Sequence, residues 1–549
     1  MTTTLLPSAH IDTWPRQQLP PLSEWPVLSC EAPYLYPPRL NAAVRLLDDA
    51  VREGHGDRIA LVTPDAHGGW AHVTYRDLAT QVDALATVLV RDMGLVPGNR
   101  VLLRGFNGQW MAAAWLATLK AGLVAVSTMP LLRAKELGVI IERAQCTAAL
   151  CDGRLVDELR HALCVPLLPG AVQCWGTDAP DGLEALMAAH AAPFTACDTS
   201  SDDVCLIAFT SGTTGVPKGC MQFHRDVMAM SDGFAHQVLG IRADDRCIGT
   251  PPLAFTFGLG GLLTFPLAAR ASTVLLERAS PETLLETIAA TRATVSFTAP
   301  TFYRAMALAM AKEPARFTTS SLRASVSAGE ALPDATRTLW REATGVEMLD
   351  GIGATEMIHI FIAAAGEEVR PGAIGRAVPG YTVAILDDDL RPVPTGEVGR
   401  LAVRGPTGCR YMDDARQRDY VRGGWNLTGD AATIDADGYV FFKARTDDLI
   451  LSSGYNIGAP EVEAAVLLHP DVAECAVVGV PDADRGHAVK AFIVLKAGAI
   501  GDDALAHGIQ DFVKATIAPY KYPRLVEFVS ALPKTDTGKL QRFRLKEPK

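Results

Sequence analysis

Residues 210–219 combine, within ten positions, three glycines, four hydroxyl side chains and one lysine. Glycine allows the backbone to turn its N–H groups inward, hydroxyl groups add hydrogen-bond donors, and lysine supplies a positive charge for phosphate oxygens. The apolar run directly before this stretch, Val204–Phe209, predicts a buried strand of a parallel sheet. A glycine-rich loop at the end of such a strand indicates a phosphate-binding site.

The lysine of this loop has unusual neighbours. In the P-loop of nucleoside triphosphatases a hydroxyl residue follows the lysine and holds magnesium. Here Lys218 lies between Pro217 and Gly219. A metal ion bound together with the phosphates therefore needs a ligand from elsewhere in the chain.

A second stretch, residues 350–356, ends in a hydroxyl group and a carboxylate. Thr355 is a candidate donor to a phosphate, and Glu356 offers the hard oxygen that Mg²⁺ prefers. Three later stretches also combine turn residues with charges: 425–430, where Asp430 could accept both hydroxyls of a ribose, 443–450, and 532–542. Taken singly, each stretch also fits an ordinary surface turn or a solvated charged segment.

Composition narrows the class of ligand. The chain of 549 residues has 51 basic and 62 acidic side chains and a net charge of −11, which argues against nucleic acid as a partner. A hydrophobic content of 48% with 21% charged residues is typical of a soluble globular protein. The length predicts two or more domains.

The 11 cysteines form no Cys-x-x-Cys pair and no zinc-type cluster, a pattern typical of free thiols in a reducing compartment. The N-terminal residues lack the basic and apolar regions of a signal peptide. The longest apolar stretch, Met111–Val126, is interrupted by Lys120 and is too short to span a membrane. We therefore expect a cytoplasmic protein that does not contact a membrane.

Strands and helices alternate up to about residue 330, after a proline-rich stretch, residues 1–40, that predicts irregular surface structure. Thr74 and Asp77 form a capping-box pattern at the start of an amphipathic helix. Further expected elements are helices over Trp110–Ala121 and Pro281–Ala290, and strands over Val101–Arg104, Leu123–Val126, Thr273–Leu276 and Thr294–Phe297. This alternation predicts doubly wound, mainly parallel sheets.

The pattern changes after residue 375. Short strands separated by turns rich in Gly, Asp and Pro predict an antiparallel or barrel-like subdomain: Tyr381–Leu386, Gly399–Arg404 and Gly438–Lys443. A smaller α+β unit follows, with helices over Pro460–Leu468 and Asp503–Thr516 and strands over Ala473–Val480 and Val489–Leu495. We predict an α/β fold with a large N-terminal domain, residues 1–445, of doubly wound sheets plus a small β-barrel-like subdomain. A hinge joins it to a small α+β C-terminal domain, residues 446–549.

In this order and spacing, the 210–219 loop, Thr355-Glu356, Asp430 and the terminal Gly538-Lys539 resemble the adenylate-forming superfamily, which includes acyl- and aryl-CoA synthetases, luciferases and adenylation domains. The resemblance covers nearly the whole chain. It implies two half-reactions on one enzyme. A carboxylate first attacks the α-phosphate of ATP and releases pyrophosphate, and a thiol then displaces AMP from the acyl-adenylate.

The resemblance also implies roles for individual residues. The phosphate loop would hold the β- and γ-phosphates, Thr355 would meet the α-phosphate, and Glu356 would be the magnesium ligand. Lys539 would bridge the carboxylate and the α-phosphate, so Lys539, Thr355 and Glu356 are the expected catalytic residues. The expected ATP-binding residues are Thr210, Ser211, Gly212, Thr213, Thr214, Gly215, Lys218, Gly329, Glu330, Ala331, Asp350, Gly351, Ile352, Asp430 and Arg445.

One lysine cannot serve both steps if it blocks the path of the thiol, so the resemblance implies that the small domain rotates. Asp447 falls at the pivot position, although a surface linker acid is the alternative. Ser453, Gly454 and Tyr455 would line the pantetheine channel of CoA after rotation. Arg485 is a further candidate for CoA, with a solvated arginine as the alternative.

The acid is the least specified substrate. Residues 350–359, with His359 just past Glu356, are similar to those of benzoate-CoA and 2-aminobenzoate-CoA ligases, and the opening residues 10–26 resemble the 2-aminobenzoate branch. A flat aromatic acid needs a short apolar slot with a polar group at one end. Phe255, Ala328, Gly329 and His359 are the expected lining, with a buried structural histidine as the alternative for His359.

The predicted function is therefore an ATP- and magnesium-dependent aryl-CoA ligase, with coenzyme A as co-substrate and 2-aminobenzoate (anthranilate) as the favoured acid. Benzoate, and loading of a carrier-protein thiol in place of CoA, stay open as alternatives. A catalytically silent nucleotide-binding protein is the third hypothesis, but it predicts loss of Lys539, Glu356 or Asp430, and all three are present. The expected partners are small molecules only, and the chain is expected to be a monomer or a homodimer.

Overall fold

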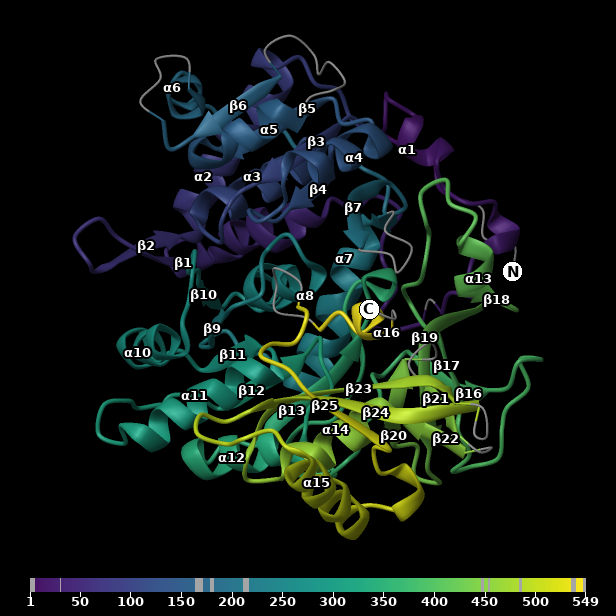
Figure 1. Cartoon of the computed structure of the whole chain (residues 1–549). Helices are drawn as coiled ribbons and strands as arrows, with labels where there is room; N and C mark the ends of the chain where they lie inside the picture. Colours follow the sequence, from purple (N-terminus) through teal and green to yellow (C-terminus); the bar gives the residue numbers. More distant parts are fainter. Residues whose placement is uncertain are drawn as a thin grey trace.

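The structure is a computed structural model that describes residues 5–29, 31–162, 171–177, 182–210, 217–445, 449–452, 455–482, 486–534 and 540–546. Its described elements form four sheets with helices packed around them (Figure 1). Among the described helices, none is both long and apolar enough to cross a membrane. The fold is mixed α/β, as the alternating pattern predicts.

A six-stranded sheet has the order β6-β5-β3-β4-β7-β8. Its strands are β3 (Arg100–Arg104), β4 (Val124–Thr128), β5 (Ala148–Asp152), β6 (Val172–Trp175), β7 (Val204–Thr210) and β8 (Lys218–Phe223). All neighbours pair in parallel except β7 and β8, which are antiparallel and place Thr210 opposite Lys218. The two ends of the 210–219 loop therefore start and finish side by side.

A nine-stranded sheet has the order β15-β14-β13-β12-β11-β9-β10-β1-β2. Its members are β1 (Ile59–Pro64), β2 (Trp70–Thr74), β9 (Arg246–Gly249), β10 (Ser272–Val274), β11 (Val295–Thr298), β12 (Ala324–Ala328), β13 (Met348–Gly353), β14 (Ile360–Ala363) and β15 (Arg376–Ala377). Within this order, all neighbours from β13 across to β1 pair in parallel. Antiparallel strands lie at both edges, β14 and β15 beyond β13 and β2 beyond β1.

Helices link these strands and share one core with both sheets. The helices of this part are α1 (Trp14–Gln17), α2 (Tyr75–Thr87), α3 (Gln109–Lys120), α4 (Ala134–Ala144), α5 (Val156–Ala162), α6 (Leu183–Ala188), α7 (His224–Met230), α8 (Thr256–Leu259), α9 (Phe265–Ala268), α10 (Pro281–Thr291), α11 (Pro300–Lys312) and α12 (Asp334–Thr344). Every residue of α3 from Met111 to Lys120 is buried, and one apolar cluster joins α3 to strands of both sheets. The predicted capping box of α2 is present, because the side chain of Thr74 accepts from Asp77 N and the carboxylate of Asp77 accepts from Thr74 N.

Two short π-helical segments extend helices that carry site residues: η6 (Ser231–Leu239) continues α7, and η7 (Gly260–Thr264) connects α8 to α9. Elsewhere in this part, helical turns of the same or the 3₁₀ type are η1 (Leu22–Glu24), η2 (Val44–Asp48), η3 (Val51–His55), η4 (Val88–Asp92), η5 (Gly153–Leu155), η8 (Thr355–Met357) and η9 (Gly366–Glu368).

The region that the short-strand pattern marks as antiparallel is a five-stranded antiparallel sheet of order β16-β17-β19-β18, with β20 paired to β19. Its elements are β16 (Thr382–Leu386), β17 (Gly399–Arg404), α13 (Gln417–Tyr420), β18 (Val421–Arg422), β19 (Trp425–Ile434) and β20 (Val440–Arg445).

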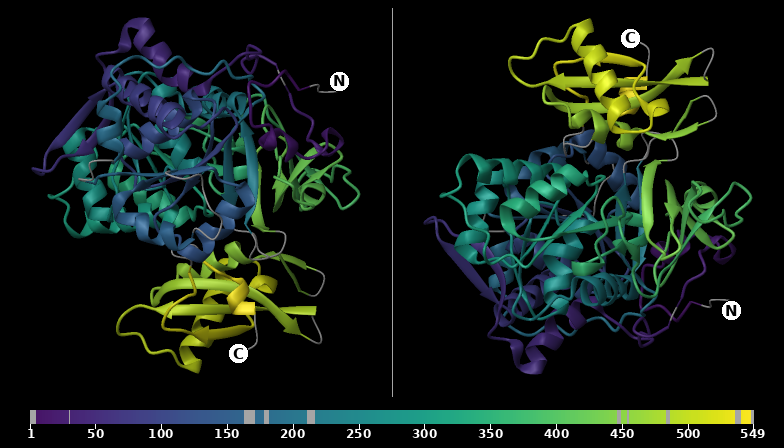
Figure 2. Two further views of the ribbon diagram at one scale, coloured as in Figure 1. Left: turned by 90° about the horizontal axis from the view of Figure 1, so that it is seen from above. Right: turned by 90° about the horizontal axis from the view of Figure 1, so that it is seen from below.

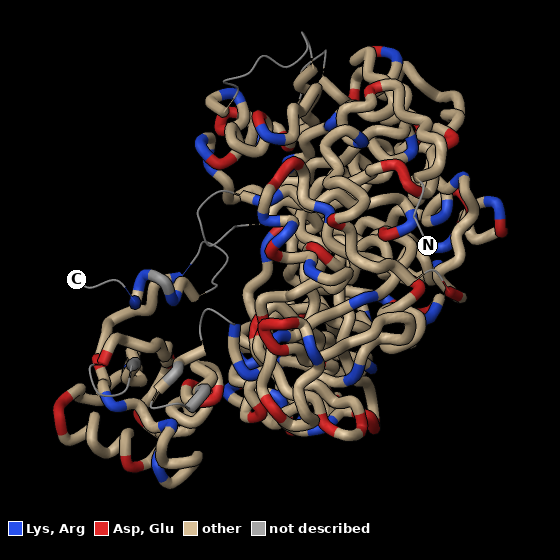
Figure 3. The backbone as a smooth tube through the Cα atoms, turned by 90° about the vertical axis from the view of Figure 1, so that its right-hand side faces the viewer, with Lys and Arg blue, Asp and Glu red and all other residues tan. Residues whose placement is uncertain are grey.

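The elements that follow gather into a smaller body beside the rest (Figure 2). It contains β21 (Leu449–Ser452), β22 (Tyr455–Gly458), α14 (Ala459–Leu467), β23 (Val472–Asp482), β24 (Gly486–Leu495), α15 (Asp503–Thr516), η11 (Pro519–Lys521), β25 (Leu525–Phe528) and α16 (Phe543–Lys546). Five strands pair in the order β22-β21-β24-β23, with β25 parallel to β24. Basic and acidic residues are interspersed over both bodies (Figure 3). The predicted boundary after Arg445 stays a prediction, because residues 446–448 lie outside the described ranges.

The proline-rich N-terminal residues run along the surface of the larger body, and we call residues 5–29 the N-terminal strap. At one end Ala9 N donates to Asp203 Oδ2 at 2.9 Å. At the other end Val27 N donates to Gly424 O at 2.9 Å and Ser29 N to Gly405 O at 3.0 Å. The strap thus connects the six-stranded sheet to the antiparallel sheet.

Candidate active site

The expected ATP-binding residues 329–331 and the Thr355–Glu356 pair follow the ends of two neighbouring parallel strands, β12 and β13. Strand β12 ends at Ala328, which pairs with Gly351 of β13. Gly329 follows in a left-handed conformation with φ of +89°, which favours glycine. Beyond the end of β13, Thr355 and Glu356 form the 3₁₀ turn η8. The carboxyl ends of parallel strands are where α/β folds bind ligands.

Lys218 and Glu356 meet across a tyrosine. The hydroxyl of Tyr411 donates to Glu356 Oε1 at 2.5 Å and accepts from Lys218 Nζ at 2.6 Å. The direct distance from Lys218 Nζ to Glu356 Oε1 is 3.6 Å. Burial, together with the adjacent Glu356 carboxylate, raises the pKa of the Tyr411 phenol far above its ordinary value. The phenol therefore stays protonated and can donate to the carboxylate.

The backbone of Thr355 is anchored to the same strand that carries Lys218. Gln222 of β8 donates through Nε2 to Thr355 O at 2.9 Å, and the Gln222 side chain is fully buried. The turn with the expected catalytic threonine and glutamate is therefore held against β8. The structure thus joins the end of the phosphate loop to the predicted magnesium ligand.

Asp430 and Arg445, the expected ribose contacts, are cross-strand partners in β19 and β20. Arg445 Nη1 donates to Asp430 Oδ1 at 2.9 Å and to Thr428 O at 3.0 Å. Burial lowers the pKa of the Arg445 guanidinium, but the nearby Asp430 carboxylate and the more weakly coupled Glu356 outweigh it and raise the pKa overall. The Glu356 carboxylate is therefore close enough to Arg445 to act on its charge.

His359 lies in an aromatic enclosure. Its ring packs edge-on against Phe265 at a centroid distance of 4.6 Å, and the rings of Phe234 and Phe257 lie at 5.6 Å and 5.7 Å. Burial lowers the pKa of His359 to about 3, so the imidazole is neutral at pH 7. A Cβ on Gly260 of η7 would lie 2.5 Å from His359 Cδ2, and therefore only glycine allows this close packing.

The polar atoms of His359 are incompletely used. Nε2 lies 3.4 Å from the carbonyl oxygen of Phe257, and Nδ1 is buried with no hydrogen-bond partner among the described residues. Two of the other expected lining residues differ in exposure, since Ala328 is 6% exposed and Phe255, at the start of α8, is 39% exposed. The lining roles stay predictions.

Further expected ATP-binding residues lie in β13 and in the loop before α12. Burial raises the pKa of the Asp350 carboxyl, in β13, to about 7. Ile352 is half-buried against the main core. Glu330 and Ala331 follow Gly329 directly in the loop before α12. Several predicted site residues lie outside the described ranges: Ser211, Gly212, Thr213, Thr214, Gly215, Asp447, Ser453, Gly454, Arg485 and Lys539.

Tyr411 and Gln222 are site residues that the sequence patterns do not reveal. Neither belongs to a glycine-rich or charged stretch, and each reaches the site through pairing of segments far apart in the chain. The contact of Lys218 with Tyr411 spans 193 positions, and that of Gln222 with Thr355 spans 133. A tyrosine within a loop carries no local signal of such a contact.

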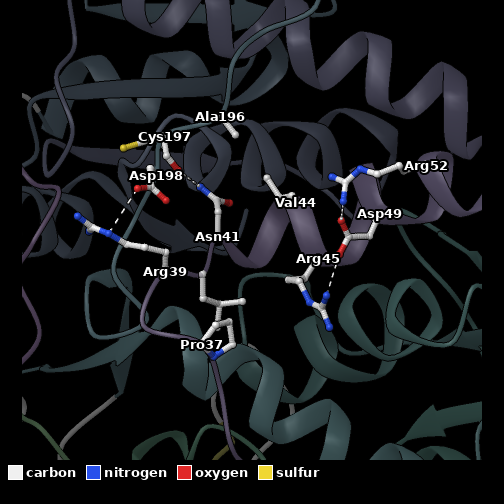
Figure 4. A pocket seen from close by; sticks show the side chains of 11 residues that line it. Pro37, Arg39, Asn41, Val44, Arg45, Asp49, Arg52, Ala196, Cys197 and Asp198 are labelled. Atoms are coloured by element: carbon white, nitrogen blue, oxygen red, sulfur yellow. Dashed lines mark hydrogen bonds and ion pairs between the residues drawn. The ribbon is translucent and has the colours of Figure 1, made fainter.

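A surface pocket of about 380 Å³ lies apart from these residues, between the segment 37–52 and residues 196–198 (Figure 4). Its arginines are paired within the pocket itself, Arg39 with Asp198 and both Arg45 and Arg52 with Asp49. The charges that line this pocket are therefore engaged by one another, and we do not assign it to the reaction.

Comparisons with known proteins assign the chain to a family. A family model described as AMP-binding enzyme matches residues 47–410, and one described as AMP-binding enzyme C-terminal domain matches residues 461–539. The chain belongs to the AMP-binding enzyme family. Relatives that match almost the whole chain are AMP-forming CoA ligases, and the chain is an enzyme of the acid–thiol ligase class.

Individual relatives cover almost the whole chain. A benzoate–CoA ligase of Thauera aromatica is 36% identical over 515 residues, which are 93% of this chain and 96% of that protein. The crystal structure of the anthranilate CoA ligase AuaEII with anthranoyl-AMP superposes with a TM-score of 0.85 at 35% identity, covering 93% of this chain and 97% of that one. The crystal structure of a benzoate CoA ligase from Burkholderia xenovorans LB400 superposes with a TM-score of 0.82 at 32% identity, covering 92% of this chain and 100% of that one. The predicted superfamily and fold are confirmed.

Proposed function

We propose that this enzyme of the AMP-binding family is an ATP- and CoA-dependent aryl-CoA ligase whose preferred acid is 2-aminobenzoate. The observation that supports the class of reaction is the Lys218–Tyr411–Glu356 cluster together with the Asp430–Arg445 pair, because these are the residues proposed to contact phosphate, metal and ribose. The choice of acid rests on the likeness to the anthranilate CoA ligase and on the aromatic enclosure of His359.

Magnesium fits the residues at this site. Mg²⁺ in phosphoryl-transfer enzymes is usually held by one or two carboxylates, several waters and the substrate phosphates. Glu356 supplies such a carboxylate, and no described residue hydrogen-bonds its second oxygen. When bound, magnesium would neutralise negative charge on the phosphates and on the departing pyrophosphate. Glu356 is therefore the proposed metal ligand.

In the first half-reaction, a carboxylate oxygen of the acid attacks the α-phosphorus of ATP, and the bond to the bridging oxygen of pyrophosphate breaks. Lys218 and the 210–219 loop hold the β- and γ-phosphates. Asp430 and Arg445 orient the ribose, and residues 329–331 and 350–352 flank the adenine. Thr355 and Lys539 contact the α-phosphate, where Lys539 also draws in the carboxylate.

In the second half-reaction, the thiol of CoA loses its proton, its sulfur attacks the carbonyl carbon of the aryl-adenylate, and AMP leaves. We propose that the C-terminal body rotates between the two steps, with Asp447 at the pivot. Residues 453–455 then line the channel for the pantetheine arm, and Arg485 is the proposed contact for the CoA nucleotide. The cytoplasmic location predicted from the cysteine pattern is part of this proposal.

The neutral imidazole of His359 is the proposed polar contact of the acid. Its buried Nδ1 has no partner among the described residues, and an unpaired buried polar atom is costly unless a ligand satisfies it. A site built to hydrogen-bond a substituent discriminates strongly against the analogue that lacks it. His359 can therefore separate 2-aminobenzoate from benzoate.

The test is pyrophosphate release with ATP, Mg²⁺ and CoA across 2-aminobenzoate, benzoate, the hydroxybenzoates and phenylacetate. We expect the highest kcat/KM with 2-aminobenzoate. No preference for 2-aminobenzoate would refute the proposed substrate. If the enzyme acylates a holo-carrier protein but not free CoA, the carrier protein is the acceptor in place of CoA.

A matched variant localises the discrimination. His359→Phe keeps an aromatic ring inside the enclosure but removes both ring nitrogens. We expect its kcat/KM for 2-aminobenzoate to fall roughly ten- to a hundred-fold, while benzoate is less affected. Equal losses for both acids would assign His359 to the carboxylate, and no loss for either would make it a structural residue.

A further inference from the structure

The hydroxyl of Tyr411 is the only described group placed between Lys218 and Glu356. It accepts from the lysine ammonium at 2.6 Å and donates to one carboxylate oxygen at 2.5 Å. The two charges lie 3.6 Å apart, which is longer than a direct charge-assisted hydrogen bond of about 2.7–2.9 Å. The phenol thus acts as a spacer within an ion pair.

The backbone around Tyr411 holds this hydroxyl in place. Residues 410–412 run beside β8, since Met221 N donates to Arg410 O at 2.8 Å and Met412 N donates to Gly219 O at 2.8 Å. Gln417 accepts from Tyr411 N at 2.9 Å and donates to Glu24 O of the N-terminal strap at 2.8 Å. Tyr411 is fully buried. Its segment is therefore fixed on both sides, and the hydroxyl is presented to the site by the fold.

A spacer has a physical purpose at this position. Lysine and glutamate that touch directly would neutralise each other, and that contact would have to break before phosphate and metal could bind. A phenol satisfies both groups at once, because it can accept from the ammonium and donate to the carboxylate. One carboxylate oxygen stays without a hydrogen bond from any described residue.

We propose that Tyr411 is a positioning residue that keeps Lys218 and Glu356 apart and oriented, ready for the magnesium complex of ATP. This inference rests on the proposed function, in which Lys218 serves the phosphates and Glu356 the metal. It adds a residue that acts through both of them and touches neither the acid nor CoA.

The variant is Tyr411→Phe, which removes only the hydroxyl. The matched control is Tyr420→Phe, because Tyr420 lies nearby in α13, its ring packs on Tyr411 at 5.7 Å, and its hydroxyl is buried without a partner among the described residues. Binding of the magnesium complex of AMPPNP, a non-hydrolysable ATP analogue, is measured by calorimetry. We expect Tyr411→Phe to weaken it roughly ten-fold or more, and Tyr420→Phe to stay within about two-fold of the parent protein.

Two further readouts exclude a merely structural effect. Thiolation of a supplied aryl-adenylate needs neither the β- and γ-phosphates nor magnesium, so its rate should be unchanged in Tyr411→Phe. In the Glu356→Gln background, where one charge of the pair is gone, adding Tyr411→Phe should change AMPPNP binding by less than about three-fold. This double variant also leaves no unpaired carboxylate that could disturb folding.

Equal losses in Tyr411→Phe and Tyr420→Phe would overturn the proposal, as would additive effects in the double variant or a parallel fall in thiolation. The outcome is separable from that of the proposed function. Failure of the parent protein to adenylate any aryl acid would refute the function, whereas analogue binding tests Tyr411 with the nucleotide alone.

Discussion

Two histidines of the larger body are buried as neutral rings. Burial lowers the pKa of His224 to about 3 and that of His359 to about 3. His224 Nδ1 accepts from Ala42 N at 3.1 Å, and the charged groups that act on its ring are Asp203, which raises the pKa, and His10, which lowers it. An unfolded chain protonates both rings near pH 6.5. Protonation therefore favours the unfolded chain.

The sign of the effect follows from proton binding. Between about pH 6.5 and 3 the unfolded state binds a proton at each ring that the folded state does not, so stability falls as the pH falls. We expect His224→Asn, which keeps an acceptor for Ala42 N, to remove about 1.4 kcal/mol per pH unit from the slope of the unfolding free energy in this range. Urea unfolding at a series of pH values measures it.

The quantity to compare is the difference in pH slope between the variant and the parent protein, because other buried groups change stability with pH in the opposite direction. Burial raises the pKa of Asp350 from 3.8 to about 7, so this carboxyl stabilises the folded state as the pH falls through that window. His72→Asn is the control, since His72 is exposed in β2. Parallel pH curves for His224→Asn and the parent protein would contradict the assignment.

Among the elements, α7 is tied to the loop before Tyr411 by a fully buried ion pair. Arg410 Nη2 donates to Asp226 Oδ2 at 2.8 Å, and both side chains are completely inaccessible. The guanidinium also lies over the ring of Phe223, 4.1 Å from its centroid. Burial raises the pKa of Asp226 and lowers that of Arg410. Burial thus outweighs the mutual attraction of the pair.

We therefore expect a strongly asymmetric response to mutation. Asp226→Asn leaves Arg410 buried without a counter-charge and should destabilise the protein by about 3–5 kcal/mol. Replacing both residues, as Asp226→Leu with Arg410→Met, should cost less, because neither position then holds a buried charge, although Phe223 N loses its acceptor, Asp226 Oδ2. The midpoint of urea unfolding measures both.

Glu286→Gln provides the control for the buried pair. It breaks the ion pair between Glu286, whose side chain is 51% exposed, and Arg316, whose side chain is 44% exposed. Because both charges are solvated, the change in stability should be about 1 kcal/mol or less. A double variant as unstable as Asp226→Asn alone would show that the pair is needed for packing and not only for charge balance.

Local patterns predict several elements of this fold closely. Helix α15 and strand β17 have the bounds expected from periodicity and capping, and β24 begins three residues earlier than expected. Strand order cannot be predicted in this way. Strand β9 lies between β10 and β11, and this arrangement depends on pairing between segments far apart in the chain. The same holds for the site. The residue types and the neighbours of Lys218, Glu356 and Asp430 identify them in the sequence. Tyr411 reaches the site only because residues 410–412 pair with the distant strand β8.

At the scale of the whole molecule, two bodies share one proposed reaction. Lys539 belongs to the stretch matched by the C-terminal family model, whereas Lys218 and Glu356, the proposed phosphate and metal contacts, lie in the larger body. If the C-terminal body delivers Lys539 for the first step only, the two half-reactions can be separated by mutation. A parallel loss of both would contradict rotation of this body.

We expect Lys539→Ala to lower adenylate formation by roughly 10²–10³-fold or more and to leave thiolation of a supplied aryl-adenylate unchanged. Pyrophosphate release and thioester formation measure the two steps. Lys534→Ala is the control, because Lys534 precedes Lys539 by only five positions in the sequence and its ammonium is paired with Glu474 at 2.6 Å. This control should retain both half-reactions.

The N-terminal strap cannot complete its contacts until much later segments of the chain have been translated. Glu24 accepts from Gln417 and pairs with Arg418, residues synthesised 393 and 394 positions later. At typical ribosome speeds of 5–20 residues per second, the strap waits roughly 20–80 s for these partners. Trp25, whose ring packs 5.8 Å from that of Phe223, is exposed for part of that time. Removing the strap would leave Gln417, which accepts from Tyr411 N, without its contact to Glu24.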